Sequence, residues 1–411
     1  MLVVQKYGGS SVANAERIGR VADRIAAGYR KGHKMVVILS AQGDTTDDLI
    51  AKAREINNNP SKRELDMLLA TGEQQSVALT AMAVIKRGLP AISLNAMQIR
   101  LRSSSAYGNA RIKNVNTDRI NAELERGNIV FIAGFQGVNR FGDITTLGRG
   151  GSDTTAVAIA AALDADVCEI YTDVDGVYTA DPRVVKNARK IDVISYNEML
   201  ELASLGAKVL HNRSVELAKK FNVKLVVRSS LNDHEGTIVK EEAKVEKTYI
   251  TGVCVDKDVA RIAVIGVKDR PGIAFRLFSM LAKSNINVDL ILQSIGRGST
   301  KDITFTVAKP NLNETLELIK NHKNSVEYER LDYDDKVAKI SVVGAGISTN
   351  CGVASLMFEA LFDADVNINM ISTSEIKISV LINEKDADRA ANFVHDKFME
   401  NHDDGMAFDE G

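Results

Sequence analysis

The chain has 411 residues, more than one ordinary domain holds and enough for two or three. Its 52 Lys and Arg residues nearly balance 54 Asp and Glu residues, and the formal net charge is −2. This balance provides no overall basic field for nucleic acid or an anionic membrane. No apolar run reaches the roughly 18 residues that a membrane span requires, and the N-terminus lacks a signal-peptide pattern. We expect a cytoplasmic protein that binds neither nucleic acid nor membrane.

The spacing of the three cysteines supports neither a metal site nor a disulfide. Cys168, Cys254 and Cys351 lie far apart, and none belongs to a CxxC or Cys/His pattern. Neither a zinc site nor a disulfide framework is expected. No metal ion is therefore predicted to be held by protein ligands alone.

The first part of the chain, residues 1–240, alternates β-branched runs with helical patterns. This alternation predicts an α/β domain with a mostly parallel sheet between helices. One helix candidate carries Ile18, Val21 and Ile25 at helical spacing, and another is an alanine-rich stretch around 157–163. The expected strands are Val3–Val4, Met35–Leu39, Ile129–Ala133, Val167–Tyr171 and Lys224–Arg228.

Beyond residue 250 the chain repeats itself. Gly272-Ile273-Ala274 recurs 80 residues later as Gly352-Val353-Ala354, and Ile286–Asp289 recurs at the same offset as Val366–Asn369. Each copy runs strand, glycine turn, helix and two strands, which predicts a ferredoxin-like βαββαβ unit. A chance similarity of two β-rich segments is the alternative. The last strands of this pattern are Ile303–Val307 and Ile376–Ile382.

The charged segment 241–247 is poor in core-forming residues and predicts a domain boundary near 236–248. The alternative is a solvated helix inside one domain. With the repeat, the boundary gives three expected domains, whose ranges are 1–240, 262–338 and 339–411.

The segment Lys6–Val12 lies between the first expected strand and the first expected helix. Gly8 and Gly9 let backbone N–H groups approach a phosphate, the helix N-terminus adds a partial positive charge, and Lys6 adds a full one. The segment is not a Walker loop, because GxxxxGK[ST] is absent. It indicates a phosphate cradle, and a tight turn with a solvated lysine is the alternative.

The segment Leu147–Thr155 opens the alanine-rich helix with three glycines in four positions. Ser152 or Asp153 is expected to cap this helix, and Arg149 is expected to grip a carboxylate through two hydrogen bonds. Asp153 beside a phosphate needs nearby cations or a metal to compensate its charge. A capped helix with a surface arginine is the alternative reading.

The segment Thr172–Tyr178 follows the expected strand Val167–Tyr171. Ligands of open parallel sheets bind outside the carboxyl ends of the strands, so a nucleotide is expected at this edge. The Asp-x-Asp-Gly pattern also begins a calcium loop, but the remaining ligand positions are missing. A plain turn is the main alternative.

Together these motifs resemble the aspartokinases, within the wider amino acid kinase family. The resemblance covers nearly the whole chain in the right order, and the two repeats resemble the paired ACT domains of the same enzymes. It implies a kinase that uses ATP with Mg²⁺ to phosphorylate the side-chain carboxylate of L-aspartate, the first step of lysine, threonine and methionine biosynthesis. The matching segments are KYGGSSV at 6–12, TGE at 71–73, GFQG at 134–137, GRGGSDTTA at 148–156, YTDVDGVYTADPR at 171–183 and GAKVLH at 206–211.

The resemblance also implies roles for single residues. Lys6 would contact the transferred phosphate, Lys208 would be a second phosphate-binding lysine, and Asp153 would hold both lysines. Glu73 would bind the ammonium group of aspartate, and Arg149 its α-carboxylate. The further residues implied are Thr46, Gly150, Gly151 and Ser152 for the substrate, and Tyr7, Gly8, Gly9, Ser10, Thr172, Asp173, Tyr178 and Arg183 for the nucleotide.

Paired ACT domains imply amino-acid effectors, namely lysine, threonine or both, and association of chains into homodimers or tetramers. Asn287 and Asn367 also fit a plain helix-to-strand junction. Ala354 stands where some relatives have threonine, which weakens the transfer of effector chemistry to that position. The residues matching the effector region are Asp269, Gly272, Ile273, Ala274, Asn287, Val288, Asp289 and Gln293 in the first repeat, and Val353, Ala354, Asn367, Ile368, Ser374 and Glu375 in the second.

Two rival functions stay open. Another amino acid kinase, acting on glutamate or acetylglutamate, would share the glycine loops, although the paired repeats favour aspartate. A non-catalytic amino-acid sensor would have no need of Lys6, Asp153, Arg149 and Lys208 together. The lack of an obvious histidine base fits carboxylate phosphorylation, because a β-carboxylate with a pKa of ~3.9 is already ionised at neutral pH.

Overall fold

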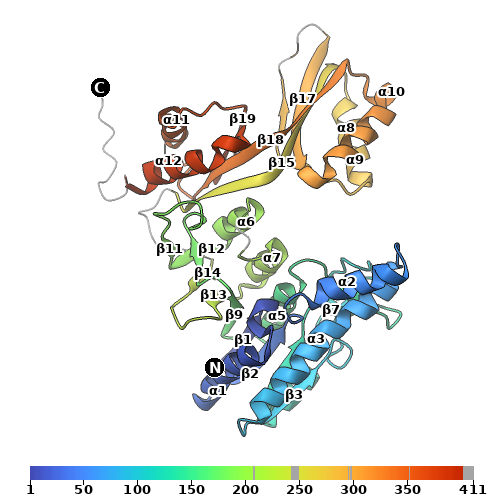
Figure 1. Cartoon of the computed structure of the whole chain (residues 1–411), viewed down its shortest axis with the longest axis vertical. Helices are drawn as coiled ribbons and strands as arrows, with labels where there is room; N and C mark the ends of the chain where they lie inside the picture. Colours follow the sequence, from blue (N-terminus) through green and yellow to red (C-terminus); the bar gives the residue numbers. More distant parts are fainter. Residues whose placement is uncertain (207–208, 242–249, 295, 297–298, 351, 401–411) are drawn as a thin grey trace. The chain divides into compact units, whose positions relative to one another are not determined.

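The computed structural model describes residues 1–206, 209–241, 250–294, 296, 299–350 and 352–400. Of these, residues 1–178 and 190–241 form one compact unit, and residues 179–189 and 250–400 form a second (Figure 1). Within the described part of the chain, no helix is long and apolar enough to cross a membrane.

The first unit is built on an eight-stranded sheet with the order β12-β14-β13-β9-β1-β2-β6-β3. Neighbouring strands are parallel except β13 and β14. The five expected strands are confirmed as β1 (Leu2–Tyr7), β2 (Lys34–Leu39), β6 (Ile129–Ala133), β9 (Val167–Thr172) and β13 (Leu225–Ser229). The sequence pattern missed three short ones, namely β3 (Ala91–Leu94), β12 (Val193–Ser195) and β14 (Thr237–Lys240).

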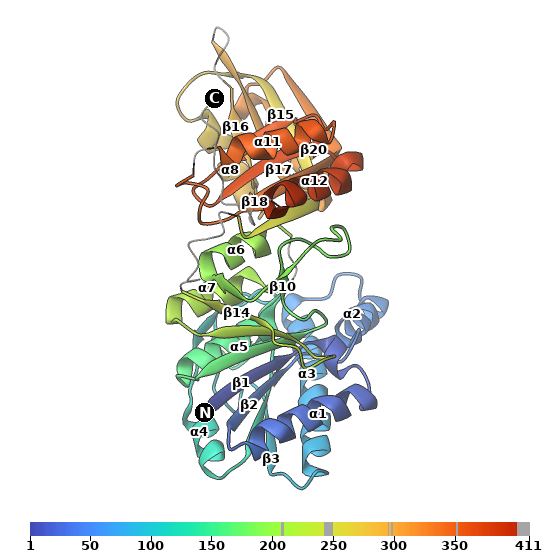
Figure 2. The same ribbon diagram turned by 90° about the vertical axis from the view of Figure 1, so that its left-hand side faces the viewer.

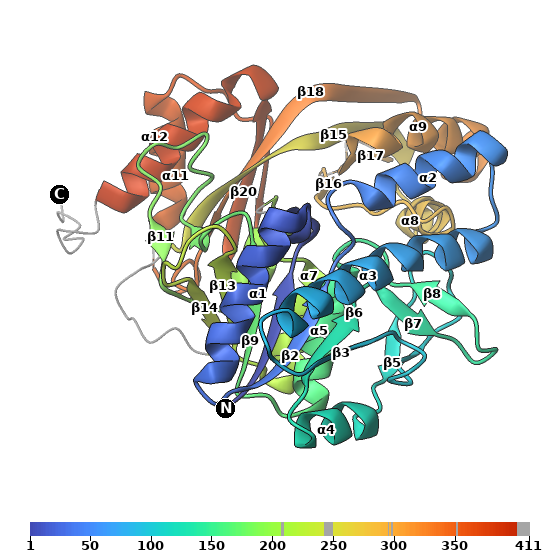
Figure 3. The same ribbon diagram turned by 60° about the horizontal axis from the view of Figure 1, so that its bottom comes forward.

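Helices cover both faces of this sheet, as Figures 2 and 3 show. The buried stripe of Ile18, Val21 and Ile25 packs α1 onto one face beside α3, whereas α5 packs onto the other. The helices of this unit are α1 (Ala15–Arg30), α2 (Thr45–Ile56), α3 (Lys62–Ile85), α4 (Asp118–Glu125), α5 (Gly151–Ala162), α6 (Tyr196–Ser204) and α7 (Asn212–Phe221), with a 3₁₀ turn η1 (Gly9–Val12).

Two smaller sheets complete the first unit. One has the order β5-β4-β7-β8 and lies beyond the end of β6, and the other is a two-stranded ladder. The strands are β4 (Arg102–Ser103), β5 (Ile112–Asn114), β7 (Gln136–Val138) and β8 (Ile144–Thr146) in the first, and β10 (Val177–Tyr178) and β11 (Lys190–Ile191) in the second.

The second unit has a six-stranded antiparallel sheet with the order β16-β17-β15-β18-β20-β19. Figure 1 shows α8 and α9 at one end of this sheet and α11 and α12 at the other. Its elements are β15 (Gly252–Lys268), α8 (Ile273–Lys283), β16 (Ile291–Gln293), β17 (Thr300–Ala308), η2 (Lys309–Asn311), α9 (Leu312–Asn321), α10 (Lys323–Val326), β18 (Arg330–Val343), α11 (Val353–Asp363), β19 (Met370–Thr373), β20 (Lys377–Asn383), η3 (Glu384–Asp386) and α12 (Ala387–Glu400).

The internal repeat corresponds to two ferredoxin-like halves, as predicted. Gly272 and Gly352 are the N-caps of α8 and α11, with φ of 91° and 96°. A left-handed backbone of this kind strains any residue with a side chain, which explains a glycine at the same place in both copies. The two halves share the long strands β15 and β18, so they form one continuous sheet.

The units differ from the expected ranges 1–240, 262–338 and 339–411 in two places. Residues 252–256 of β15 pair with residues 339–343 of β18, so the second ferredoxin-like half takes a strand from before residue 262. Residues 179–189 belong to the second unit although both flanking segments belong to the first. A local sequence pattern indicates where a strand lies but not which neighbour it pairs with, and both differences concern partners distant in sequence.

Candidate active site

The candidate site lies where the central strands of the first sheet end. Backbone hydrogen bonds continue one residue beyond these ends, because Gly8 N–H donates to Tyr171 O (3.3 Å), Ser40 N–H to Tyr7 O (3.2 Å) and Gly134 N–H to Leu39 O (3.0 Å). These bonds bring the turns after β1, β2, β6 and β9 together at one edge, as the strand order predicts.

Lys6 and Asp153 form the central ion pair of this edge. Alternation along β1 turns Val3 and Tyr7 toward α1 and therefore turns Lys6 toward α5, the helix that carries Asp153. Lys6 Nζ lies 2.6 Å from Asp153 Oδ1, and only 11% and 13% of the two side chains are exposed. The structure thus provides the cation that the Asp153 carboxylate requires.

The glycine turn after β1 is held tightly against the turn after β2. A side chain at Gly9 would place its Cβ 2.5 Å from Ala41 O, so only glycine fits there. Residues 9–12 form the 3₁₀ turn η1, and α1 begins only at Ala15 with Asn14 as its N-cap. The expected arrangement, a phosphate turn leading directly into a long helix, is therefore replaced by a short 3₁₀ turn.

Tyr7 points away from the turn. Its ring is buried and stacks on Tyr171, with the ring centroids 4.6 Å apart, and its hydroxyl donates to Gln5 Oε1. Because Lys6 faces the opposite side of the sheet, the Tyr7 side chain lies in the core of the α1 face. Only the backbone of Tyr7 is left to serve a nucleotide at this turn.

Glu73 places a buried carboxylate next to the same turns. It lies on α3, only 3% of the residue is exposed, and Oε1 accepts a hydrogen bond from Ala41 N–H (3.2 Å). Gly72 allows this approach, because a Cβ there would lie 2.8 Å from the Ala41 side chain. Oε2 has no hydrogen-bond partner among the described residues, and burial raises the pKa of the Glu73 carboxyl to about 7. This free acceptor suits a ligand ammonium group.

The start of α5 differs from the expected cap. Gly150, in the left-handed region with φ of 66°, is the N-cap, and no side chain caps the helix. Ser152 and Asp153 instead lie in the first turn, where a carboxylate still benefits from the helix dipole. Gly134 permits close packing here, because a Cβ at that position would lie 2.7 Å from Ser152 Oγ.

His211 and Arg213 are site residues that the sequence analysis did not select. A side chain at Gly150 would place its Cβ 2.3 Å from His211, and both Asp153 and Arg149 act on the pKa of His211, which burial lowers. Arg213 donates to Leu147 O (2.5 Å) and to Ala110 O (2.9 Å), holding the backbone before the glycine turn. The only signal in the sequence was that His211 ends the GAKVLH segment, with Arg213 two residues beyond it.

The remaining substrate residues surround these turns. Arg149 is exposed and forms no ion pair with any described residue, so its guanidinium is available to an anion. Thr46 lies in the first turn of α2, directly after the turn that contacts Gly9. Lys208, expected as the second phosphate-binding lysine, lies outside the described residues.

The expected nucleotide segment begins at the end of β9. Thr172 Oγ1 donates to Asp173 Oδ1 (3.0 Å), and Tyr178 OH donates to Asp175 Oδ1 (2.8 Å). The Tyr178 hydrogen bond lowers the pKa of Asp175. Arg183 is exposed, pairs with Asp181 at 2.7 Å and belongs to the second unit.

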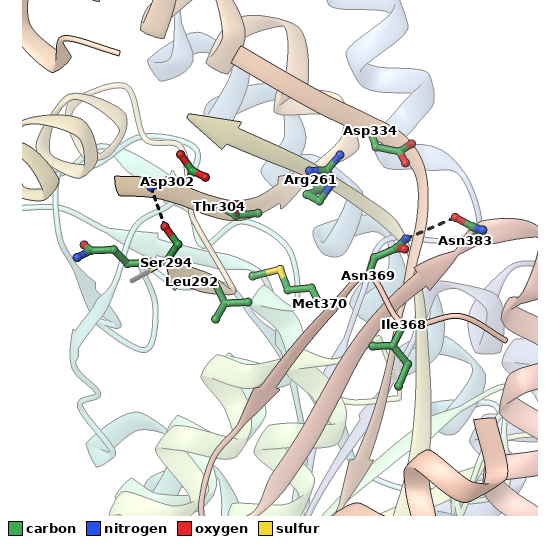
Figure 4. A pocket seen from close by; sticks show the side chains of 11 residues that line it. Arg261, Leu292, Ser294, Asp302, Thr304, Asp334, Ile368, Asn369, Met370 and Asn383 are labelled. Atoms are coloured by element: carbon green, nitrogen blue, oxygen red, sulfur yellow. Dashed lines mark hydrogen bonds between the residues drawn. The ribbon is translucent and has the colours of Figure 1, made fainter. Parts of the chain in front are cut away.

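The second unit holds a cavity of about 690 Å³ at which its two halves meet (Figure 4). Gln293 of the first repeat and Ile368 of the second line it, and both were expected effector residues. Arg261, Asp302 and Asp334 bring charges of both signs to the lining, as the zwitterion of an amino acid requires. Figure 4 also shows the hydrogen bonds from Asp302 N–H to Ser294 Oγ and between the amides of Asn369 and Asn383.

The other expected effector residues lie around the helix starts and the helix-to-strand junctions of the two halves. Asp269 pairs with Lys301 at 3.0 Å, and Asp289 pairs with the buried Lys339. Asn287 and Asn367 stand between helix and strand, where the plain junction reading also places them. The geometry therefore leaves the effector roles as predictions.

Comparison with known proteins identifies the family. A family model described as Amino acid kinase family matches residues 1–229, and ACT domain models match residues 261–324 and 340–398. The aspartokinase of Mycolicibacterium smegmatis is 50% identical over 410 residues, which cover 98% of this chain and 97% of that one. The chain belongs to the aspartokinase family. It is accordingly an ATP-dependent kinase with two ACT domains.

Other aspartokinases are similar to this chain over nearly their full length. The aspartokinase of Corynebacterium glutamicum is 50% identical over 404 residues, which cover 97% of this chain and 96% of that one. The structure of E. coli aspartokinase III with aspartate and ADP, an R-state, has a TM-score of 0.82 at 26% identity, covering 97% of this chain and 99% of that one. The T-state with lysine and aspartate gives 0.78 with the same identity and coverage. The predicted fold is confirmed.

Proposed function

We propose that the chain transfers the γ-phosphoryl group of ATP to the β-carboxylate of L-aspartate, releasing ADP and 4-phospho-L-aspartate. The observation that supports this best is the ion pair of Lys6 with Asp153 beside the glycine turn, at the edge where the strand ends converge. An ammonium group held there opposes the negative charge of two reacting anions, which is the main obstacle in this reaction.

In the proposed reaction an oxygen of the β-carboxylate attacks the γ-phosphorus, and the bond to the bridging oxygen of ADP breaks. The carboxylate is already ionised, so no side chain has to remove a proton. Lys6 and the N–H groups of the 8–10 turn would stabilise charge on the γ-phosphate as it transfers. Asp153 would hold the Lys6 ammonium group beside the turn through their ion pair.

Substrate orientation is proposed to depend on Glu73 and Arg149. The unpartnered Oε2 of Glu73 would accept the ammonium group of aspartate, and the exposed guanidinium of Arg149 would bind its α-carboxylate. Two fixed ends of the amino acid would leave the β-carboxylate as the free end. This reading favours an α-amino acid over acetylglutamate, whose nitrogen carries no charge.

Mg²⁺ is expected to accompany ATP. Among the described residues no group of three His, Cys, Asp or Glu side chains could hold a metal ion. A site with few carboxylates fits Mg²⁺ carried mainly by nucleotide phosphates, with Asp153 and Asp173 as the nearby acidic side chains. When bound, Mg²⁺ would supply further charge compensation on the phosphates.

A coupled assay of ADP release across L-aspartate, L-glutamate and N-acetyl-L-glutamate tests the proposal, with hydroxylamine trapping of the acyl phosphate as a second readout. We expect turnover with L-aspartate and hydroxamate in equal amount. Preferential turnover of either other acid would contradict the proposed substrate.

Replacing Arg149 with Ala is expected to raise the KM for aspartate about 30-fold and to change kcat less than threefold. The guanidinium would bind a carboxylate that takes no part in the reaction, so its loss affects binding rather than the transition state. Steady-state kinetics measure both constants, and Arg140→Ala, which removes the exposed guanidinium of the 139–143 turn, is the control. An unchanged KM would remove Arg149 from the substrate site.

Regulation is proposed to act through the second unit. Lysine, threonine or both would bind among the effector residues of the two halves and inhibit the kinase. The enzyme would work in the cytoplasm, at the first step of lysine, threonine and methionine biosynthesis.

The exposed edge strands β16 and β19 would allow chains to pair into dimers or tetramers. Kinase assays with each amino acid, combined with light scattering, test both statements, and binding without a change in activity would refute inhibition.

A further inference from the structure

Asp66 is a buried carboxylate of the first unit that the proposed reaction does not use. It lies on α3, and only 1% of the residue is exposed. Oδ2 accepts hydrogen bonds from the N–H groups of Thr146 (2.8 Å) and Gly108 (2.9 Å), and Oδ1 accepts one from the hydroxyl of Thr146 (2.7 Å). One side chain of α3 thus holds two segments that lie 42 and 80 residues away in the sequence.

The two segments that this carboxylate holds also contact each other, directly before the glycine turn of the site. Ala110 N–H donates to Thr146 O (2.9 Å), and a Cβ at Gly148 would lie 3.2 Å from Gly108 O. Only two residues separate Thr146 from Arg149. Because the reach of so short a stretch is small, the place of Thr146 limits where the backbone of Arg149 can lie.

The same helix carries Glu73, the residue proposed to bind the ammonium group of the substrate. Asp66 and Glu73 are seven residues apart, which is almost two helical turns, so both side chains lie on one face of α3. Glu73 contacts the turn after β2 through Ala41 N–H, whereas Asp66 contacts β8, which lies beside α3 (Figure 3). One helix therefore connects the proposed ammonium site with the segment that leads to Arg149.

Contacts other than those of Asp66 also anchor α3. Val77 and Val84 are buried in the core of the α1 face. Gln136 of β7, 1% exposed, donates from Nε2 to Ala70 O (3.1 Å), one turn beyond Asp66. Because the helix is fixed at these points, loss of the Asp66 carboxylate would displace the segment that it holds and leave α3 in place.

We infer that Asp66 is a positioning residue for aspartate, because it fixes the segment that carries Arg149 at a set distance from Glu73. The inference rests on the proposed function in one respect, that Arg149 and Glu73 bind the α-carboxylate and the ammonium group. Both groups sit on one carbon of the substrate, so their two partners need a fixed separation, and a displacement of about 1 Å is costly. Asp66 acts through the backbone and not by contact with the substrate.

The test is a double-mutant cycle of Asp66→Ala and Arg149→Ala in the full-length enzyme, with the KM for aspartate as the readout. We expect Asp66→Ala to raise this KM about tenfold, less than Arg149→Ala does, because the guanidinium is displaced and not removed. In the Arg149→Ala background, Asp66→Ala should raise the KM less than twofold. The kcat and the KM for ATP should stay within about threefold of the wild type in Asp66→Ala.

Conservative variants separate positioning from loss of structure. Asp66→Asn should stay within about threefold of the wild type, because its amide oxygen can accept both N–H groups and its NH₂ group can donate to the Thr146 hydroxyl. Thr146→Val removes only that hydroxyl and should raise the KM for aspartate about fivefold, since it leaves a buried oxygen of Asp66 without a donor. It takes the place of Asp66→Ala in the cycle if that variant does not fold.

Thr145→Val is the matched control. It breaks a buried hydroxyl pair with Ser103 (2.7 Å) on the same strand, where alternation turns the side chain away from Asp66. An equal rise in the KM for aspartate in this control would mean general loosening of the small sheet and would overturn the inference. A full tenfold effect of Asp66→Ala in the Arg149→Ala background would overturn it as well.

Failure of the proposed function gives a different result. An unchanged KM in Asp66→Ala, with a raised KM in Arg149→Ala, would refute the role of Asp66 alone. An unchanged KM in Arg149→Ala would contradict the proposed substrate site and, with it, the role of Asp66. A wild type that prefers L-glutamate would contradict only the proposed substrate, since the same cycle measured with glutamate still decides the role of Asp66.

Discussion

Lys6→Ala is expected to lower kcat by about 10³-fold or more while the first unit remains folded. The ammonium would act on charge that develops during phosphoryl transfer, and removing one such group from a preorganised site typically costs this much. The KM for aspartate should change little, because Lys6 is assigned to the phosphate and not to the amino acid. Steady-state kinetics with saturating ATP and aspartate measure the effect.

Stability has to be separated from catalysis in that experiment, since Lys6→Ala leaves the Asp153 carboxylate almost buried without its cation. Removing one partner of a buried pair costs about 3–5 kcal/mol. The double variant Lys6→Ala/Asp153→Asn removes both charges and should recover most of the lost Tm without recovering kcat. Activity within tenfold of the wild type in either variant would exclude Lys6 from catalysis.

The repeating patterns of the chain predicted the fold well because each follows from local geometry. The β-branched runs became β1, β2, β6, β9 and β13 because a strand buried on both faces needs apolar residues at nearly every position. The glycines at 272 and 352 marked the starts of α8 and α11 because the backbone there is left-handed. Such features depend on a few consecutive residues, so the local sequence is enough to predict them.

Contacts between segments far apart in the sequence were harder to predict. Glu73 was predicted from a family pattern alone, whereas the Ala41 N–H that holds it comes from another turn. Asp153 was expected both as a possible cap and, from the family pattern, as a partner of Lys6; the left-handed Gly150 is the cap instead, and the carboxylate pairs with Lys6. The place of residues 179–189 in the second unit could not be predicted, because nothing in their sequence shows that α12 is their partner.

The two carboxylates of the site differ in their partners: Asp153 is paired with a cation, and Glu73 is not. Asp153 has a cation at 2.6 Å, whereas Glu73 has only a backbone N–H on one oxygen and no partner among the described residues on the other. Burial of Glu73 without a cation is unfavourable in the free protein, and a ligand ammonium would relieve it. Part of the free energy of substrate binding would thus come from pairing the ammonium group with a carboxylate that has no cation in the free protein.

Glu73→Gln is accordingly expected to weaken aspartate binding about 100-fold at pH 8, since a charge-assisted hydrogen bond to the ammonium group is lost. With the pKa of Glu73 at about 7 in the free enzyme, the wild-type Kd for aspartate should rise about tenfold from pH 8 to pH 6, because only about a tenth of Glu73 is ionised at pH 6. The Kd of the variant should be flat over this range. Isothermal titration at several pH values measures both, and a flat wild-type profile would contradict the role of Glu73.

The same substitution should have the opposite effect on the ligand-free protein. A carboxyl whose pKa is raised by folding, here from 4.5 to about 7, contributes stability that is present below pH 4.5 and is lost as pH rises through 7. At pH 8 the ionised Glu73 therefore costs on the order of 3 kcal/mol, a cost that the neutral amide of the Glu73→Gln variant would not incur. Thermal unfolding at pH 8 should show a higher Tm for Glu73→Gln than for the wild type, and aspartate should raise the Tm of the wild type far more than that of the variant. A substitution that raises the Tm of the ligand-free protein and weakens aspartate binding would identify Glu73 as a binding group. Replacing a carboxylate with a purely structural role would instead lower both the Tm and the affinity.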